Sequence, residues 1–435
     1  MSWLNFFQTP SPCQISFGRG IYATVNPDEE ELFNQSYQAF EKKEIIDAYE
    51  YFFKSLINYT DNESNENITM VKSENELKFE IFQGNAKIDG VITQESLQAE
   101  VTLVKSNVSV ALKRYILERN YQLTYANYFS DGEFIKLKLY LDNITLSPQK
   151  IFFPLRELAL NADFDKEHIM SEFPDVRLEE TSHINAINSD ELQIKYDYLQ
   201  STIEELDAKV LTLPSNDNAG MQAFLYLNIL FKIDYILVPK YKIYQKLSKK
   251  VQDYFGDENT TIESKNEELK RYVAKLKELS FNEFSTNFYS AKYTFNPIEK
   301  SSYEEMSNFI SESLNKIKWY KNNRYPQVIP TIYSYIAFYA LYNYGVNPVV
   351  RELLHILVQV QNSSFFTLVK CGTLYDEEKQ TFSKRQIISK LQDIVTNNQE
   401  KYKSLVIFSD DLNFESLNEF SYSYYTMLKN LDFEE

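Results

Sequence analysis

The sequence predicts an α+β fold, in which an N-terminal antiparallel sheet with flanking helices is followed by a mainly α-helical region. Residues 77–105 alternate apolar and polar side chains with the period of two that is typical of strands. From residue 190 onward, apolar residues recur mostly at helical spacing. Only 9 of the 435 residues are glycine, which favours long helices and regular strands over tight backbone loops.

Three segments are expected along the chain. A chain of 435 residues is too long for one ordinary hydrophobic core. We therefore expect an N-terminal segment at 1–25, an α+β domain at 26–180 and a mainly helical domain at 185–435. Within the α+β domain, the polar stretch 58–76 predicts a loop.

The α+β domain is expected to begin with a helical hairpin at 26–57. Asn26 suits the N-cap, Pro27 suits the first helical position, and Glu29 has the spacing of a capping box. Residues 39–56 also resemble the second half of a tetratricopeptide repeat. No further copy follows at a period of about 34 residues, and such arrays need about three copies, so a single hairpin is the prediction.

The sheet is predicted from alternating stretches separated by turn residues. Gly84 and Asn85 fit a hairpin turn between the first two strands, and Asp131 and Gly132 fit the turn of a second hairpin. The predicted elements are strands at 77–83, 86–94 and 97–105, a helix at 107–120, a hairpin at 121–143 and a helix at 147–164.

This order of elements resembles the fold shared by type III secretion chaperones and the YbjN-like proteins. The resemblance rests on ALKRYILERNYQLTYANYFSDGEFIKLKLYL, a helix running into a hairpin, and on LALNADFDKEHIMSEF in the closing helix. In that family the closing helix often ends in an Ala-Asp pair, and here the pair is Ala162-Asp163. The resemblance covers about 140 of the 435 residues, within the predicted α+β domain. It implies a secretion-chaperone-like protein whose sheet side supports dimerisation or partner binding.

The remainder of the chain predicts helices. Helical patterns cover 190–213, 219–255, 266–284 and the stretch after 384. Pro239 is expected to break or kink the second of these patterns. Residues 363–383 are ambiguous and fit a β-hairpin.

A long uncharged run, residues 325–350, is interpreted as core rather than as a membrane span. Pro330 fits the first helical position and Gly345 the end, which leaves about 21 Å of helix at roughly 1.5 Å per residue. A membrane span needs about 20 continuous apolar residues. Asn347 then caps a second helix, so the prediction is a buried helical hairpin.

Charge and cysteine content restrict the partners and the compartment. The formal net charge of −17 argues against binding of nucleic acid and of anionic membrane surfaces. Cys13 and Cys371 lie far apart in the sequence, and we expect both to be reduced. The first residues lack the pattern of a secretory signal, so a cytoplasmic location is expected. No cofactor is expected.

Side chains suited to catalysis are scarce. The histidines His168, His183 and His355 lack metal-ligand spacing, and no catalytic, cofactor-binding or metal residues are predicted. His355 lies on an apolar helix face and is expected to be a core or half-buried histidine rather than a catalytic one. His168 follows Asp163 and Asp165, and the favoured interpretation of this acidic corner is a helix end that frays into a solvated loop. The alternative is an enzyme site between the two domains, built from carboxylates and tyrosines such as Asp163, Asp165 and His168.

Two groups of side chains are the predicted partner-binding residues. The first group consists of large aromatic residues on both faces of one predicted strand, namely Tyr121, Tyr125, Tyr128 and Phe129. That such residues simply fill cores stays open as an alternative. The second group is Lys242 and Lys246, which recur at helical spacing. A solvated helix face is their favoured interpretation, ahead of an acidic protein partner and of nucleic acid.

The expected function is that of a cytoplasmic protein-interaction or chaperone-like protein without catalytic activity. Its expected partner is another protein, which includes a second copy of the chain as a homodimer. The first alternative is an enzyme whose carboxylate and tyrosine site lies in the cleft between the domains. The second alternative is a structural subunit of a larger assembly.

Overall fold

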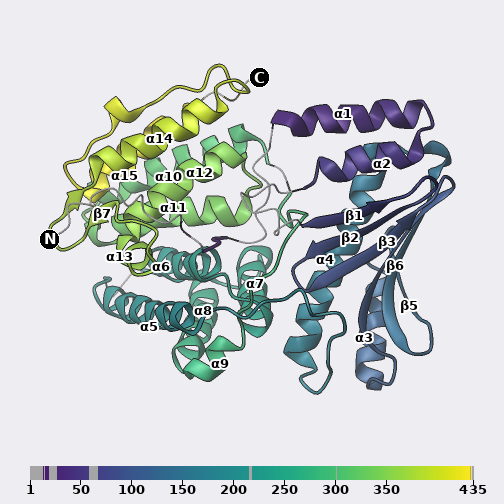
Figure 1. The fold of residues 1–435 in the computed structure, drawn as a ribbon. Helices are drawn as coiled ribbons and strands as arrows, with labels where there is room; N and C mark the ends of the chain where they lie inside the picture. The colour runs from purple at the N-terminus through teal and green to yellow at the C-terminus, as the bar shows by residue number, and fades with distance from the viewer. Residues whose placement is uncertain are drawn as a thin grey trace, which may run out of the picture.

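The computed structural model describes residues 13, 15–18, 27–57, 67–214, 218–299, 301–431 and 433. It confirms the predicted α+β fold, because a six-stranded antiparallel sheet with flanking helices precedes a mostly helical region (Figure 1). We call residues 27–180 the sheet region and residues 185–433 the helical region. The predicted N-cap Asn26 and most of the predicted segment 1–25 lie outside the described residues.

Two helices, α1 (Pro27–Glu41) and α2 (Ile45–Lys54), form the predicted hairpin at the start of the sheet region. The chain turns between them at Lys43, whose φ of 63° is left-handed. The apolar face of α2 packs on the sheet, and the ring centroids of Phe53 and Phe79 lie 4.6 Å apart. Burial of aromatic side chains on the sheet therefore stabilises a hairpin that is too short to be stable alone.

The sheet has the strand order β1-β2-β3-β4-β6-β5, and each strand is antiparallel to its neighbours. Its strands are β1 (Ile68–Lys72), β2 (Leu77–Gln83), β3 (Ala86–Ile92), β4 (Ser96–Lys105), β5 (Asn127–Ser130) and β6 (Phe134–Asp142). Helix α3 (Val110–Asn120) connects β4 to the edge strand β5. The prediction of a loop at 58–76 is wrong for residues 68–72, which form strand β1. Ile68 is buried, and the strand pairs with β2 along its length.

Helix α4 (Pro148–Glu172) lies across one face of the sheet and contacts β2, β3, β4 and β6. Ala159 and Ala162 are fully buried on this side, and their small side chains allow the helix to approach the strands closely. The helix continues to Glu172 rather than ending near residue 164. The predicted fraying into a solvated loop is therefore wrong, since Asp165 and Glu167 are buried within the helix.

The helical region is a stack of helices beside the sheet region (Figure 1). Its main helices are α5 (Ser189–Leu211), α6 (Ala219–Lys232), α7 (Tyr241–Gly256), α8 (Ile262–Lys277), α9 (Phe281–Ser285), α10 (Tyr303–Asn322), α11 (Ile329–Asn343), α12 (Pro348–Gln361), α13 (Ser363–Leu368), α14 (Lys384–Asn398) and α15 (Leu417–Leu428). A short hairpin of β7 (Tyr375–Asp376) and β8 (Thr381–Phe382) follows α13. The β-hairpin predicted at 363–383 is therefore present only in the second half of that range, and the range begins with α13.

Two predictions for the helical region are confirmed. The chain leaves α6 through a π-helical turn, η4 (Ile233–Leu237), and begins α7 only after Pro239. Helices α11 and α12 form the buried hairpin predicted from the uncharged run, and α11 packs against α6, α10, α12 and α15. Over the described ranges, every helix falls short of the length and apolarity needed to cross a membrane.

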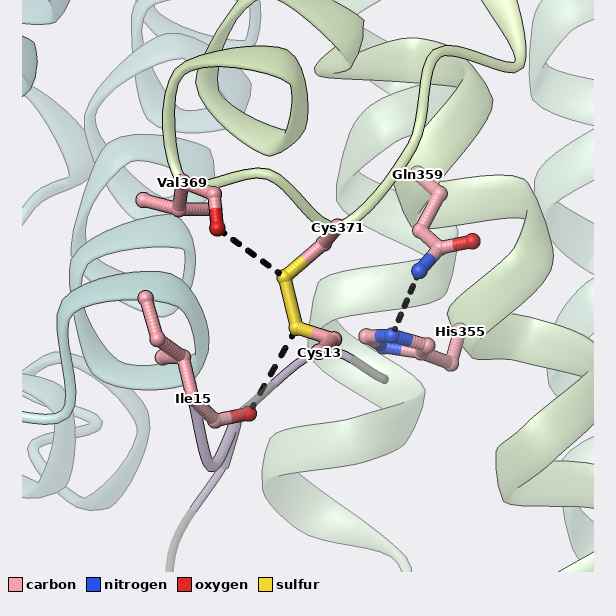
Figure 2. The surroundings of a disulfide bond; sticks show 6 residues. All are labelled: Cys13, Ile15, His355, Gln359, Val369 and Cys371. Carbon is pink, nitrogen blue, oxygen red and sulfur yellow. Dashed lines mark hydrogen bonds between the residues drawn. A yellow bond between two sulfur atoms is a disulfide. The ribbon is translucent and has the colours of Figure 1, made fainter. Parts of the chain in front are cut away.

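The two cysteines form a disulfide, so the expectation of two reduced thiols is wrong (Figure 2). The Cα atoms of Cys13 and Cys371 are 4.6 Å apart, although 358 positions separate them in the sequence. The pairing is possible because residues 15–18 lie against the helical region, where the backbone N–H of Gly18 donates to the carbonyl of Tyr235 at 2.8 Å. Sequence distance alone could not indicate this contact.

The sheet region and the helical region have separate hydrophobic cores with one exception, Phe295. This residue follows α9 in the helical region, yet its side chain is 1 % exposed in the core of the sheet region. The Gln83 side chain accepts the backbone N–H of Phe295 at 2.8 Å and donates to its carbonyl at 3.1 Å. Residues 289–297, which we call the docking segment, therefore join the two regions, and the predicted domain boundary near residue 180 stays a prediction.

Replacing Phe295 by alanine is expected to lower the free energy of unfolding by about 3 to 5 kcal/mol, because it leaves a cavity in a packed core. Chemical denaturation followed by circular dichroism measures the change. Phe153→Ala is the matched control, since Phe153 is 57 % exposed on α4, and it should cost far less. Equal losses for the two variants would contradict the packing role of Phe295.

Candidate ligand-binding cleft between the two regions

A cavity of about 350 Å³ lies where the docking segment and the start of α7 meet α4. This volume is within the range of small-molecule sites, about 300 to 1,000 Å³. Its walls come from both regions. The charged and hydroxyl-bearing side chains that line it are Arg119, Asp163, Glu167, Lys240, Tyr244 and Tyr293.

Helix α4 presents Asp163 and Glu167 to this cavity on the same face, because residues four apart are neighbours on a helix. The turn between β2 and β3 touches the first of them. The backbone N–H of Asn85 donates to Asp163 Oδ1 at 2.7 Å. A Cβ atom on Gly84 would lie 2.2 Å from that oxygen, and the φ of Gly84 is +55°. Glycine is therefore required here both for the backbone conformation and for the close approach to Asp163.

The carboxyl group of Asp163 has few partners. Within the described chain, the N–H of Asn85 is the one hydrogen bond that reaches it. Burial, followed by repulsion from Glu167, raises the pKa of Asp163 from 3.8 to about 7, although the charges of Lys240 and Lys166 oppose the shift. Asp163 is thus a carboxyl that can both hold and release a proton near neutral pH, with an oxygen left for a ligand.

Glu167 and Lys240 are held by tyrosines of the helical region. Glu167 accepts a hydrogen bond from the Tyr289 hydroxyl at 2.8 Å, and burial raises the pKa of that tyrosine well above its ordinary value. The Lys240 ammonium donates to the Tyr293 hydroxyl and lies 4.6 Å from the centre of the Tyr293 ring. Both tyrosines belong to the docking segment, so this segment positions one wall of the cavity.

Lys240 is placed by an unusual stretch of backbone. Val238 and Tyr241 have positive φ angles of 54° and 44°, a conformation that bulky side chains rarely adopt. The backbone N–H of Lys240 donates to the carbonyl of Asn287 at 2.8 Å, which fixes the corner between η4 and α7. Such backbone outliers are most common at functional sites, where surrounding contacts maintain them.

Lys166 supports the β2–β3 turn from inside the protein. Its ammonium donates to the carbonyls of Asn85 at 3.2 Å and Glu179 at 2.8 Å, and its side chain is fully buried. Burial lowers the pKa of Lys166 to about 8. Because Lys166 and Asp163 contact the same turn, the position of the Asp163 carboxyl depends on this buried amine.

Asp165, by contrast, is a fully satisfied structural carboxylate. It accepts hydrogen bonds from the hydroxyls of Tyr115 and Tyr128 and from Arg119 Nε, the last at 2.8 Å. His168 stacks on Tyr115 with 4.3 Å between ring centroids. Of the three residues named for the alternative enzyme site, only Asp163 lines the cavity, whereas Asp165 and His168 belong to the network on its flank.

The structure separates the four predicted aromatic residues. Strand β5 begins only at Asn127, because the Glu157 carboxylate accepts the backbone N–H groups of residues 124–126 at 2.7 to 2.9 Å. Tyr121 and Tyr125 are therefore exposed on a loop, and Tyr128 is buried on Asp165. Phe129 is half-buried, with the Lys138 ammonium 5.8 Å from its ring centre. The four side chains do not share one strand, and partner binding by them stays a prediction.

Lys242 and Lys246 are exposed on α7, beside the face that buries Ile243 and Leu247. This placement agrees with a solvated helix face, and partner binding by these lysines stays a prediction. His355 is half-buried, which agrees with the expected core or half-buried histidine, and the Tyr235 hydroxyl lies 2.8 Å from its Nδ1 atom. Burial lowers the pKa of His355 to about 3.

Sequence reasoning missed several residues of the cleft. Asp163 and Glu167 are four residues apart in a predicted helical stretch, and this spacing could have placed both on one helix face. Lys240 follows the predicted break at Pro239, but nothing in the sequence indicates that this corner meets α4. Tyr289 and Tyr293 carry no sequence signal, since the docking segment has no regular secondary structure. As to metals, the parts of the chain that are described contain no cluster of three or more His, Cys, Asp or Glu residues suited to an ion.

No family model matches the chain, and no curated protein matches its sequence significantly. The resemblance of the sheet region to secretion chaperones and YbjN-like proteins thus rests on element order and stays a prediction. The function must be argued from the cleft itself.

The stability of the protein is expected to reflect the raised pKa of Asp163. Between about pH 4 and pH 7 the folded protein keeps this proton while the unfolded chain has lost it, so stability falls as the pH rises through this range. Asp163→Asn should remove this decrease in stability, because asparagine does not titrate. We expect the free energy of unfolding of the variant at pH 8 to exceed that of the wild type by about 1 to 3 kcal/mol. Urea denaturation from pH 4 to pH 8 measures the difference.

Glu172→Gln is the matched control for this experiment, because Glu172 is an exposed carboxyl on the same helix. Its free energy of unfolding should follow that of the wild type across the pH range. If Asp163→Asn also follows the wild type, Asp163 titrates as an ordinary surface carboxyl and the description of the cleft is wrong.

Proposed function

We propose that this protein binds a small polar molecule in the cleft and acts on it by proton transfer through Asp163. The observation that carries the proposal is a carboxyl group with one hydrogen-bond partner, which faces a cavity of small-molecule size beside a second carboxyl group. Burial and the neighbouring Glu167 raise its pKa to about 7. Groups with such properties are typical general acids and bases. This is the alternative in which an enzyme site of carboxylates and tyrosines lies between the two regions.

The surroundings of Asp163 support a polar ligand. The cavity pairs two carboxyl groups on α4 with the cations Arg119 and Lys240. A ligand with a hydroxyl or amine could donate to the open Asp163 oxygen, while its acceptor groups face Lys240 and Tyr293. Placing two carboxyl groups on adjacent turns of a partly buried helix face costs stability, and such costs are typical of functional sites.

The test is a screen of small polar molecules grouped by charge, with thermal shift at pH 7 and calorimetry of the compounds that stabilise the protein. Asp163→Asn should weaken binding of the active compounds by tenfold or more, about 1.4 kcal/mol. Calorimetry in buffers of different ionisation enthalpy should show proton uptake or release on binding to the wild type alone.

Glu172→Gln serves again as the control and should bind as the wild type does. Compounds that bind the wild type and Asp163→Asn with equal affinity would place the ligand elsewhere and contradict the proposal. A screen without any stabilising compound in any charge class would also count against it.

The second candidate is the expected protein-interaction function, with another protein or a second copy of the chain as partner. It is supported by the outer face of the sheet, where an open hollow of about 760 Å³ is lined by charged side chains. Lys87 pairs there with Glu80 at 2.7 Å, and Lys136 pairs with Glu100 at 2.9 Å. Sedimentation over a range of concentrations tests the homodimer, and a monomer at every concentration would exclude it.

We also propose the cytoplasm as the compartment of the protein. In that compartment a disulfide is usually a transient, redox-active bond rather than a permanent one. In the cytoplasm, the Cys13–Cys371 disulfide would therefore be a bond that can be reduced and re-formed.

A further inference from the structure

The Cys13–Cys371 bond ties the start of the chain to the helical region (Figure 2). Its two sulfurs differ in access. Cys13 is exposed, whereas Cys371 is 9 % exposed at the end of the turn that follows α13. Because thiol–disulfide exchange requires a thiolate to reach a sulfur atom, access selects Cys13 as the sulfur that is attacked.

Phe17, close to Cys13 in the sequence, occupies an aromatic pocket of the helical region. The ring of Phe17 lies 4.9 Å from the ring of Phe366 and 5.2 Å from that of His355, measured between centroids. The N–H of Gly18 donates to the carbonyl of Tyr235 at 2.8 Å. The Tyr235 hydroxyl in turn contacts His355 Nδ1. Phe17 thus fills a pocket formed by η4, α12 and α13.

This docking rests on few contacts besides the covalent bond. Residues 15–18 contribute one backbone hydrogen bond to the helical region and one large apolar side chain. Holding a short segment in place costs conformational entropy, about 1 to 2 kcal/mol for the backbone of each ordered residue. The disulfide removes much of this cost, because it keeps Phe17 beside its pocket at a high effective concentration.

We propose that the Cys13–Cys371 disulfide is a thiol–disulfide exchange site for a dithiol reductant, and that its opening releases Cys13 and residues 15–18 from the helical region. One thiolate of the reductant attacks Cys13 Sγ, the bond to Cys371 breaks, and Cys371 leaves as a thiolate that takes up a proton. The second thiol of the reductant then attacks the mixed disulfide. Cys13 is released as a thiol, and the reductant becomes a disulfide.

The released segment uncovers the pocket around His355. Its contact with Tyr235 is also lost, and Tyr235 lies on the π-helical turn that leads through Pro239 to Lys240. Opening of the bond is therefore expected to loosen this turn as well as the terminal segment. The disulfide can act as an exchange site whether or not the cleft binds a ligand.

The first experiment locates the attack. Full-length oxidised protein is exposed briefly to glutathione, quenched with acid and analysed by mass spectrometry. We expect the mixed disulfide on Cys13. Glutathione found mainly on Cys371, or two free thiols in protein purified without a reductant, would overturn the proposal.

The second experiment measures the release. Hydrogen exchange of residues 15–18 and 233–238 is compared with and without dithiothreitol, and both segments should exchange about tenfold faster or more after reduction. Cys13→Ser is the matched control. Because Cys13 is exposed, this variant should keep the fold, and it should exchange rapidly whether or not dithiothreitol is present. Unchanged exchange after complete reduction of the wild type would show that the disulfide does not hold the segment.

Discussion

The insertion of Phe295 into the core of the sheet region is the contact on which the arrangement of the two regions depends. The docking segment comes from the helical region, yet Gln83 at the end of β2 binds its backbone as a neighbouring strand would. The Thr294 hydroxyl donates to the carbonyl of Phe82 at 3.0 Å, and Arg156 of α4 donates to the carbonyl of Asn296. These bonds hold the docking segment against the sheet region, and α4 also packs directly against α7, so both contacts define the cleft.

The charged residues of α4 differ in how well their partners satisfy them. Asp165 accepts hydrogen bonds from three donor groups, and Glu167 accepts a hydrogen bond from Tyr289 of the docking segment. Asp163 accepts a single bond from a backbone N–H. A buried network that served stability alone would satisfy all its members, because a partly satisfied group costs free energy. The exception at Asp163, beside a cavity, is what distinguishes a candidate site from a structural network.

The sequence predicted the fold class well, because it is set by local periodicity. The alternation at 77–105 gave three of the six strands, and the proline and glycine positions gave the break at Pro239 and the hairpin of α11 and α12. Strand β1 was missed because its few apolar residues lie in a polar stretch, and only pairing with β2 makes them a strand. The extension of α4 was missed because acidic residues suggest solvent, whereas here Asp165 and Glu167 meet partners from distant segments.

The contacts that define the cleft and the disulfide could not be predicted from the sequence. Asn85 meets Asp163 across 78 positions, and Gln83 meets Phe295 across 212. Cys13 and Cys371 looked unrelated for the same reason. The aromatic residues near 121–129 were assigned to one strand because nothing local shows that Glu157 binds the backbone before β5. Each miss concerns tertiary contacts between segments that are far apart in the chain.

The docking segment is expected to make the two regions one cooperative unit, which keeps the walls of the cleft fixed. Native-state hydrogen exchange of the full-length protein at increasing urea concentrations tests it most directly. We predict that core amides of β4 and of α11 open with the same free energy and the same dependence on urea. If β4 exchanges through an opening that leaves α11 protected, the regions unfold separately and a preorganised cleft between them is contradicted.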